Sequence, residues 1–117
     1  MITVYGIPNC DTIKKTLDWL KAKKIDFEWY DYKKEGINKS KLQQWSKQVD
    51  LELLLNKKST TWKACTTEEK LAAAKKSGAI ALMAERTSLI KRPVIEKDGV
   101  VVAVGFKEET LLQKLIG

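Results

Sequence analysis

Cys10 is the residue of this sequence with the clearest potential for chemistry. In the segment YGIPNCDTIKK, residues 5–15, it stands where a strand-like run ends and a helical pattern begins. Backbone N–H groups and the helix dipole stabilise a thiolate at a helix N-terminus, and Lys14 adds a positive charge, although Asp11 opposes it. Lowering a thiol pKa from ~8.5 to about 6 raises the ionised fraction at pH 7 roughly thirtyfold. We therefore predict that Cys10 is a nucleophile rather than a buried apolar side chain.

The absence of histidine narrows the chemistry that this thiol can perform. It excludes Ser-His-Asp and Cys-His catalysis within the chain, and, without a C-x-x-C pair, it argues against a metal site. Because Ile13 stands where a second thiol would complete such a pair, an adduct on Cys10 needs another thiol for its release. Cys65 could act only if the fold brought it near. We expect an external thiol instead.

Charge and length limit the class of protein. The net charge is +7, but all except two of the 22 basic residues are lysines, and they are dispersed among acidic residues. This pattern is typical of a solvated surface and predicts no direct nucleic acid binding. No signal-like segment and no apolar run of about 20 residues occurs, so we expect a cytoplasmic protein without a membrane partner. The 117 residues suit one domain.

The elements that must position Cys10 follow from periodicity. A strand is predicted over residues 2–5, then a helix with Ile13, Leu17 and Leu20 on one face, then a strand in FEWYDY, residues 27–32. Near the other end, RPVIEKDGVVVAVGF predicts two strands joined by a tight turn at Asp98 and Gly99. A final helix is predicted, with acidic residues in its first turn and an apolar face. Its expected residues are Glu108, Glu109, Leu111, Leu112, Leu115 and Ile116.

Several short helices are predicted for the middle of the chain. Leu42, Trp45 and Val49 recur at helical spacing, and LELLL suits a short buried turn. Thr66 and Glu69 have the spacing of a capping box, and we expect Ser77–Gly78 to end the helix that follows them. The order is therefore βαβ, helices, ββα.

This order resembles the thioredoxin-like architecture, and three blocks make the resemblance specific. YGIPNCDTIKK, LLNKKSTTW and LIKRPVIEKDG together resemble the arsenate reductase-like ArsC/Spx family, most nearly its small YffB-like branch of glutathione-dependent thiol reductases. The resemblance covers nearly the whole chain. It implies an α/β, thioredoxin-like fold with a helical insertion, as a single domain over residues 1–117. Residues 1–32 and 91–117 would form the core and residues 37–90 the insertion.

The resemblance implies roles for particular residues. Cys10 would be catalytic, Arg92 would face an oxyanion or the thiol, and Pro93 would be cis and lie beside Cys10. The residues expected to bind substrate or glutathione are Asn9, Thr12, Lys14, Asn56, Lys57, Lys58, Arg92 and Pro93. For Thr12 and Asn9 the alternative is satisfaction of local backbone groups. For Lys57 and Lys58 the alternatives are binding of glutathione carboxylates or a solvated loop.

The expected function is a monothiol, glutathione-dependent thiol–disulfide oxidoreductase, with glutathione as reductant or co-substrate and no tightly bound cofactor. An Spx-like regulator that binds RNA polymerase is the alternative, but such regulators commonly carry C-x-x-C. A second alternative is an arsenate reductase, with glutaredoxin as a further partner. That activity is doubtful because arsenate reductases of the family use several arginines, whereas this chain has only Arg86 and Arg92.

Overall fold

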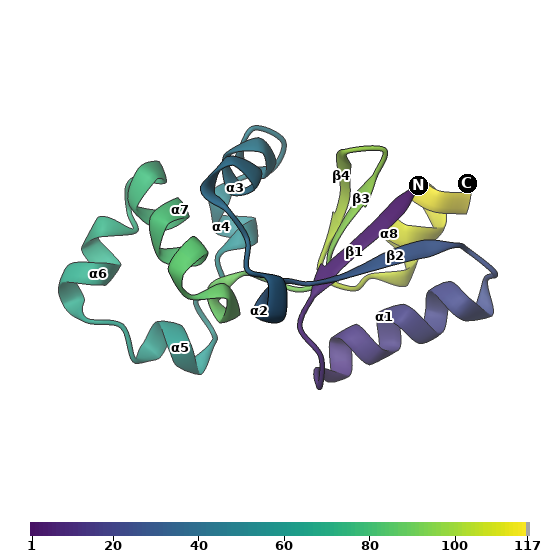
Figure 1. The fold of residues 1–117 in the computed structure, drawn as a ribbon, viewed down its shortest axis with the longest axis horizontal. Coiled ribbons are helices and arrows are strands. Elements are labelled where there is room, and N and C mark those ends of the chain that lie inside the picture. Colours follow the sequence, from purple (N-terminus) through teal and green to yellow (C-terminus); the bar gives the residue numbers. More distant parts are fainter. Residues whose placement is uncertain (117) are drawn as a thin grey trace. The chain divides into compact units, whose positions relative to one another are not determined.

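The computed structural model describes residues 1–116, which divide into two compact units (Figure 1). One contains residues 1–35 and the chain from residue 92 onward, and we call it the sheet unit. The other, the helical unit, contains residues 36–91. The predicted insertion, 37–90, falls within the helical unit. That both units belong to one domain stays a prediction.

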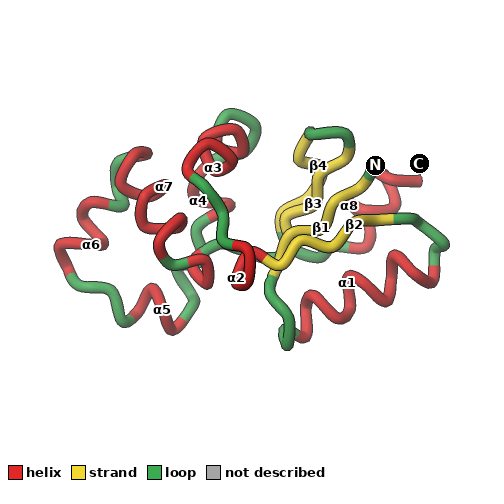
Figure 2. Tube along the Cα trace, in the orientation of Figure 1, coloured by secondary structure: helices red, strands yellow, loops and turns green. Residues whose placement is uncertain are grey.

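The sheet unit holds four strands and the helices that flank them (Figure 2). Its strands lie in the order β2-β1-β3-β4, with β1 and β2 parallel and the other pairs antiparallel. The elements are β1 (Ile2–Gly6), α1 (Asp11–Ala22), β2 (Phe27–Asp31), α2 (Tyr32–Glu35), β3 (Val94–Lys97), β4 (Val100–Val104), α8 (Glu108–Leu111) and the helical turn η2 (Leu112–Ile116).

This topology brings three chain segments to one edge of the sheet. β1 and β2 are parallel, so their carboxyl ends share an edge, and β3 begins at that edge because it is antiparallel to β1. In the register, Tyr5 of β1 pairs with Tyr30 of β2 and with Val94 of β3. The segments after β1, after β2 and before β3 therefore meet there. They carry Cys10, Tyr32 and Arg92.

α1 is anchored by apolar side chains that pack with the sheet. Trp19 and Leu20 belong to a core cluster with Val4 of β1, Ile95 of β3 and Leu111 of α8. Burying such a side chain contributes roughly 1.5–3 kcal/mol, so this cluster fixes the helix that begins after Cys10. The predicted face was incomplete, because Thr16 and Trp19 are also buried and Leu17 is only half-buried. In the last helical segments, Leu112 and Ile116 are exposed rather than packed.

The structure confirms one predicted turn and corrects the end of one predicted strand. The hairpin between β3 and β4 is confirmed, with positive φ at Asp98 and Gly99. The strand predicted to reach Tyr32 ends one residue earlier, at Asp31. The Asp31 carboxylate accepts hydrogen bonds from the backbone N–H groups of Lys33 and Lys34, and this favours a helical turn over a longer strand.

The helical unit is built from short helices around its own core. Its elements are α3 (Lys39–Ser46), α4 (Leu51–Leu54), α5 (Thr60–Lys63), α6 (Thr67–Ala72), α7 (Lys76–Glu85) and the 3₁₀ turn η1 (Thr87–Leu89). Trp45, Leu54, Met83, Leu89 and Ile90 have no exposed surface. An isolated bridge pairs Leu55 with Ile90. The predicted series of short helices is confirmed.

The start of α6 was predicted correctly and its end was not. The Thr66–Glu69 capping box is present. The helix ends at Ala72, however, and Ser77 and Gly78 lie inside α7. A Cβ on Gly78 would clash with the carbonyl oxygen of Ala72, so the glycine permits the close approach of α6 to α7.

Among residues 1–116, no helix has both the length and the apolar character needed to cross a membrane.

Candidate active site

Cys10 occupies the N-cap position of α1, as the sequence predicts. Its backbone is extended, with φ −120° and ψ 126°, and its carbonyl accepts the first helical hydrogen bond, from the N–H of Lys14 at 2.9 Å. Asn9, directly before it, has φ of +60°, which asparagine tolerates better than most residues. Asn9 therefore has a backbone role in turning the chain from β1 into α1. The thiol itself is half-buried.

The surroundings of Cys10 favour its thiolate. Burial acts to raise the pKa of Cys10, but the backbone N–H of Ile13, the Arg92 side chain and the backbone N–H of Thr12 together lower it below the ordinary cysteine value. Two of these groups belong to the first turn of α1, and the third comes from the residue before Pro93. The lowered pKa increases the fraction of nucleophile at neutral pH. Thr12 contributes through its N–H, so its hydroxyl is not required for this effect.

Arg92 and Pro93 lie at the start of β3. Their peptide bond is cis, as the resemblance implies. Pro93 is buried and its carbonyl accepts a 2.8 Å hydrogen bond from the N–H of Gly105. The Arg92 side chain interacts with Cys10 by hydrogen bonding and by charge. The predicted association of Arg92 with the thiol is thus present in the sheet unit.

Tyr32 is a member of this site that sequence reasoning missed. Its side chain has no exposed surface and forms a hydrogen bond with Arg92. Burial raises the pKa of Tyr32 to about 12, although the charge of Arg92 and its hydrogen bond act to lower it. The hydroxyl therefore stays neutral near pH 7. A signal existed: if β1 and β2 are parallel, the residue after β2 shares an edge with the residue after β1.

A pocket of about 480 Å³ opens beside the thiol. Pro8, Asn9, Cys10 and Lys14 line the part near the start of α1. This volume lies in the range of about 300–1,000 Å³ that is usual for ligand pockets. Lys14 is exposed there, so its ammonium is available to an anionic group. The predicted residues Asn9, Cys10 and Lys14 thus share one pocket.

The other three predicted binding residues belong to the helical unit. Asn56, Lys57 and Lys58 line a pocket of about 420 Å³ together with Lys91 and Glu52. The Asn56 side chain accepts a 3.2 Å hydrogen bond from the N–H of Lys58, which is a local turn contact. The Lys57 ammonium lies 5.7 Å from the ring centroid of Trp62. These contacts give Asn56 and Lys57 structural roles, and glutathione binding by this loop stays a prediction.

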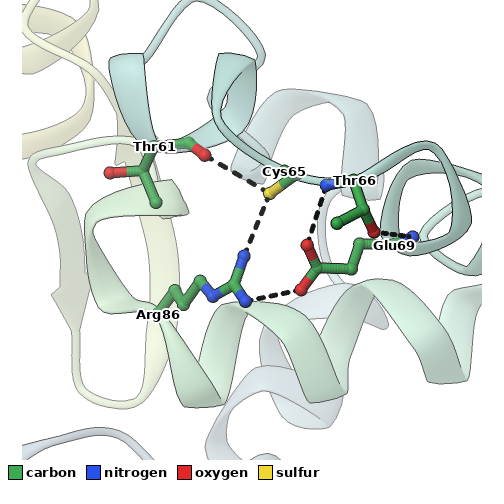
Figure 3. A network of polar contacts seen from close by, with 5 residues as sticks. All are labelled: Thr61, Cys65, Thr66, Glu69 and Arg86. Atoms are coloured by element: carbon green, nitrogen blue, oxygen red, sulfur yellow. Dashed lines mark hydrogen bonds and ion pairs between the residues drawn. The ribbon is translucent and has the colours of Figure 1, made fainter.

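Cys65, in the helical unit, has its own polar network (Figure 3). Its side chain is 7% exposed, and its thiol donates to the carbonyl of Thr61 at 3.3 Å. The sulfur accepts a 3.3 Å hydrogen bond from Nη1 of Arg86, and Nη2 of Arg86 lies 2.5 Å from Oε2 of Glu69. Both cysteines are free thiols. Burial and these contacts make Cys65 the less accessible of the two.

Residues 1–116 contain no group of three or more histidine, cysteine, aspartate or glutamate side chains that could hold a metal ion.

Comparison with known proteins decides the family. The sequence model of the ArsC family matches residues 5–114, which is most of the chain. The chain belongs to the ArsC family. An uncharacterized protein of Haemophilus influenzae is 42% identical over 109 residues, which cover 93% of this chain and 94% of that protein. The predicted family is therefore confirmed.

Solved structures of ArsC-family relatives have the same fold. A protein named YFFB is 36% identical, and the match has a TM-score of 0.92 and covers 98% of this chain and 99% of that one. A protein of Brucella melitensis described as related to arsenate reductase (ArsC) is 38% identical, with a TM-score of 0.76 and coverage of 99% and 95%. The predicted thioredoxin-like α/β fold and the likeness to arsenate reductases are confirmed.

Proposed function

We propose that this ArsC-family protein is a monothiol thiol–disulfide reductase in which Cys10 is the nucleophile and glutathione the reductant. The observation that carries the proposal is the position of the Cys10 sulfur. It lies at the N-terminus of α1, where two backbone N–H groups and Arg92 lower the pKa of the thiol. A thiolate in this setting attacks the sulfur of a disulfide. This reaction needs neither a histidine nor a second cysteine close to Cys10 in the sequence, and the chain has neither.

The reaction proceeds in two exchanges. The Cys10 thiolate attacks the glutathione sulfur of a glutathione mixed disulfide, forming a Cys10–glutathione disulfide and releasing the substrate as a thiolate. A second glutathione thiolate then attacks the glutathione sulfur of that adduct. Oxidised glutathione leaves and Cys10 returns to its thiolate form. No tightly bound cofactor is needed.

The other residues of the site bind and orient. Arg92 stabilises negative charge at the sulfur and offers a guanidinium to a substrate carboxylate. Lys14 supplies a second cation in the same pocket. Asn9 turns the backbone that presents Cys10, and buried Pro93 fixes the backbone next to Arg92. Tyr32 holds the Arg92 side chain.

The experiment measures glutathione-dependent reduction of the mixed disulfide between glutathione and 2-hydroxyethanethiol. We expect activity in the wild type and in Cys65→Ser, and none in Cys10→Ser. Mass spectrometry of Cys65→Ser should show a glutathione adduct at Cys10 when glutathione is limiting. Turnover by Cys10→Ser equal to that of the wild type would reject the mechanism.

Arsenate reduction is the second candidate, and the position of Arg92 beside Cys10 favours testing it. Arg92 can pair with an oxyanion in a bidentate manner, but the only other arginine of the chain, Arg86, is engaged with Glu69 and Cys65. We therefore expect weak arsenate reduction with glutathione and glutaredoxin as donors. Rates of arsenate and disulfide reduction measured on one preparation decide between the two substrates.

A further inference from the structure

The pocket at Cys10 continues along α1 as a groove. Beyond Lys14 it is lined by Leu17, Asp18 and Lys21 of the helix and by Trp29 of β2. Figure 1 shows α1 running beside β2 within the sheet unit. Cys10 and Lys21 are eleven residues apart, so at 1.5 Å per residue the groove follows the helix for about 16 Å.

The lining of the groove combines two apolar side chains, Leu17 and Trp29, with charged side chains of both signs, Lys14, Asp18 and Lys21. The Trp29 side chain is 37% exposed, and Leu17 is half-buried. A Cβ added to Gly6 would clash with the Ile13 side chain and would lie 3.2 Å from the Trp29 ring, so the glycine makes room chiefly for Ile13 and also for the ring. An accessible tryptophan next to a nucleophile is typical of a contact surface, since tryptophan is enriched among residues that carry binding energy.

The length of the groove indicates the size of its occupant. A fully extended chain spans at most about 3.3–3.6 Å per residue, so about 16 Å accommodates four or five residues. Glutathione has a single residue on each side of its cysteine, and it would occupy only the end of the groove near Cys10. The part of the groove beside Lys21 lies beyond its reach.

We propose that this groove binds a polypeptide, namely the four or five residues on one side of a substrate cysteine that carries a glutathione mixed disulfide. This inference rests on the proposed function and specifies its substrate class. An apolar side chain of the peptide packs on Trp29 and Leu17. An acidic side chain near the distal end pairs with Lys21.

The chemistry follows from this placement. The Cys10 thiolate attacks the glutathione sulfur, the bond between glutathione and the peptide breaks, and a Cys10–glutathione disulfide forms. The peptide sulfur departs as a thiolate and takes up a proton from water. A second glutathione thiolate then attacks that adduct and releases oxidised glutathione. The sulfur of this second glutathione is oxidised as the peptide sulfur is reduced, and the first glutathione sulfur remains in a disulfide throughout.

The first test compares glutathionylated peptides with the 2-hydroxyethanethiol mixed disulfide. Each long-flank peptide has five residues on one side of the cysteine, either the N-terminal or the C-terminal side, and these include an apolar residue and a distal acidic residue. In its short form this flank is reduced to one residue. We expect kcat/KM to be about tenfold higher for one long-flank peptide than for its short form, the size of one good anchor contact of about 1.4 kcal/mol. Lys21→Glu and Trp29→Phe should reduce kcat/KM for the long-flank peptide more than they reduce kcat/KM for the small disulfide. Lys15→Glu, an exposed α1 residue outside the groove, is the matched control.

A second measurement does not depend on turnover. In Cys10→Ser protein, titration with the reduced long-flank peptide should shift the indole N–H signal of Trp29, which the spectrum of the Trp29→Phe variant identifies. Equal kcat/KM for long and short peptides, or an unshifted Trp29 signal, would overturn the groove assignment. Loss of all disulfide turnover with a shifted Trp29 signal would reject the proposed function and leave the peptide groove standing.

Discussion

The buried Tyr32 hydroxyl and the Arg92 guanidinium are joined by a hydrogen bond at the sheet edge where Cys10 lies. Arg92 also interacts with Cys10, so one guanidinium serves a neutral phenol and a thiolate. The phenol has no exposed surface and cannot reorient freely, so it restrains the arginine. Tyr32 is thus a positioning residue, which acts on the thiol through Arg92.

Replacing Arg92 with alanine should raise the pKa of Cys10, because the guanidinium lowers it now. Without this charge-assisted hydrogen bond, the pKa of Cys10 should return toward the ordinary cysteine value. The rate of iodoacetamide alkylation against pH measures it, in a Cys65→Ser background. Arg86→Lys in the same background is the control. An unchanged alkylation profile in Arg92→Ala would contradict the role of Arg92.

Tyr32 should make the stability of the protein sensitive to alkaline pH. The pKa of Tyr32 is raised to about 12, so the native state favours the protonated phenol and the stabilisation is full below the unfolded pKa of about 10. It is lost as pH rises from about 10 to 12, by about 2–3 kcal/mol in total. Urea unfolding at pH 9 and pH 11.5 should therefore show a smaller loss of stability in Tyr32→Phe than in the wild type. An equal loss of stability in Tyr32→Phe and the wild type would show that Tyr32 does not cause the sensitivity to alkaline pH.

Thr12→Val should leave the Cys10 pKa within about 0.5 unit of the wild-type value, or about 0.7 kcal/mol. The reason is that the N–H of Thr12, which valine retains, contributes to the lowered pKa. Valine also preserves the size and branching of the side chain. Ultraviolet absorbance of the thiolate against pH gives the value. A rise of one unit or more would show that the hydroxyl contacts the sulfur.

The contribution of Glu69 to the stability of the protein should be lost at acidic pH. The N–H of Thr66 and the side chain of Arg86 lower the Glu69 pKa, so its contribution is full above the unfolded pKa of about 4.3 and is lost as pH falls through the folded value. The difference in unfolding free energy between wild type and Glu69→Gln should shrink from pH 6 to pH 3. Glu68→Gln, the exposed neighbour, serves as control. If this difference did not change with pH, the predicted pH dependence of the Glu69 contribution would be wrong.

Local signals in the sequence were sufficient for much of the fold. The capping box at Thr66 and the turn at Asp98–Gly99 depend on contacts within a few residues, and both were found. The N-cap position of Cys10 was also accessible, because a strand ends and a helix begins around it. The association of Arg92 with Cys10 came from the family resemblance, since no local pattern joins residues so far apart.

Errors arose where tertiary contacts decide. Gly78 reads as a helix end in sequence, but it lies within α7, where the absence of a Cβ leaves room for the backbone of Ala72. Tyr32 reads as the last residue of a strand, whereas Asp31 caps a turn there. Its membership of the site follows from strand pairing, which periodicity alone does not give. The groove along α1 could likewise not be predicted from the sequence, because its lining includes Trp29 from another element.

The hydrogen bond between Tyr32 and Arg92 also closes a loop of chain. The residues between them, 33–91, include the whole helical unit, so this bond joins the beginning and the end of the insertion. The entropic cost of closing a flexible loop grows only logarithmically, by about 0.6 kcal/mol for each doubling of its length. An insertion that leaves and returns at such a point can gain or lose helices at little cost to the thiol site, and this makes the helical unit the part of the molecule that is freest to diversify.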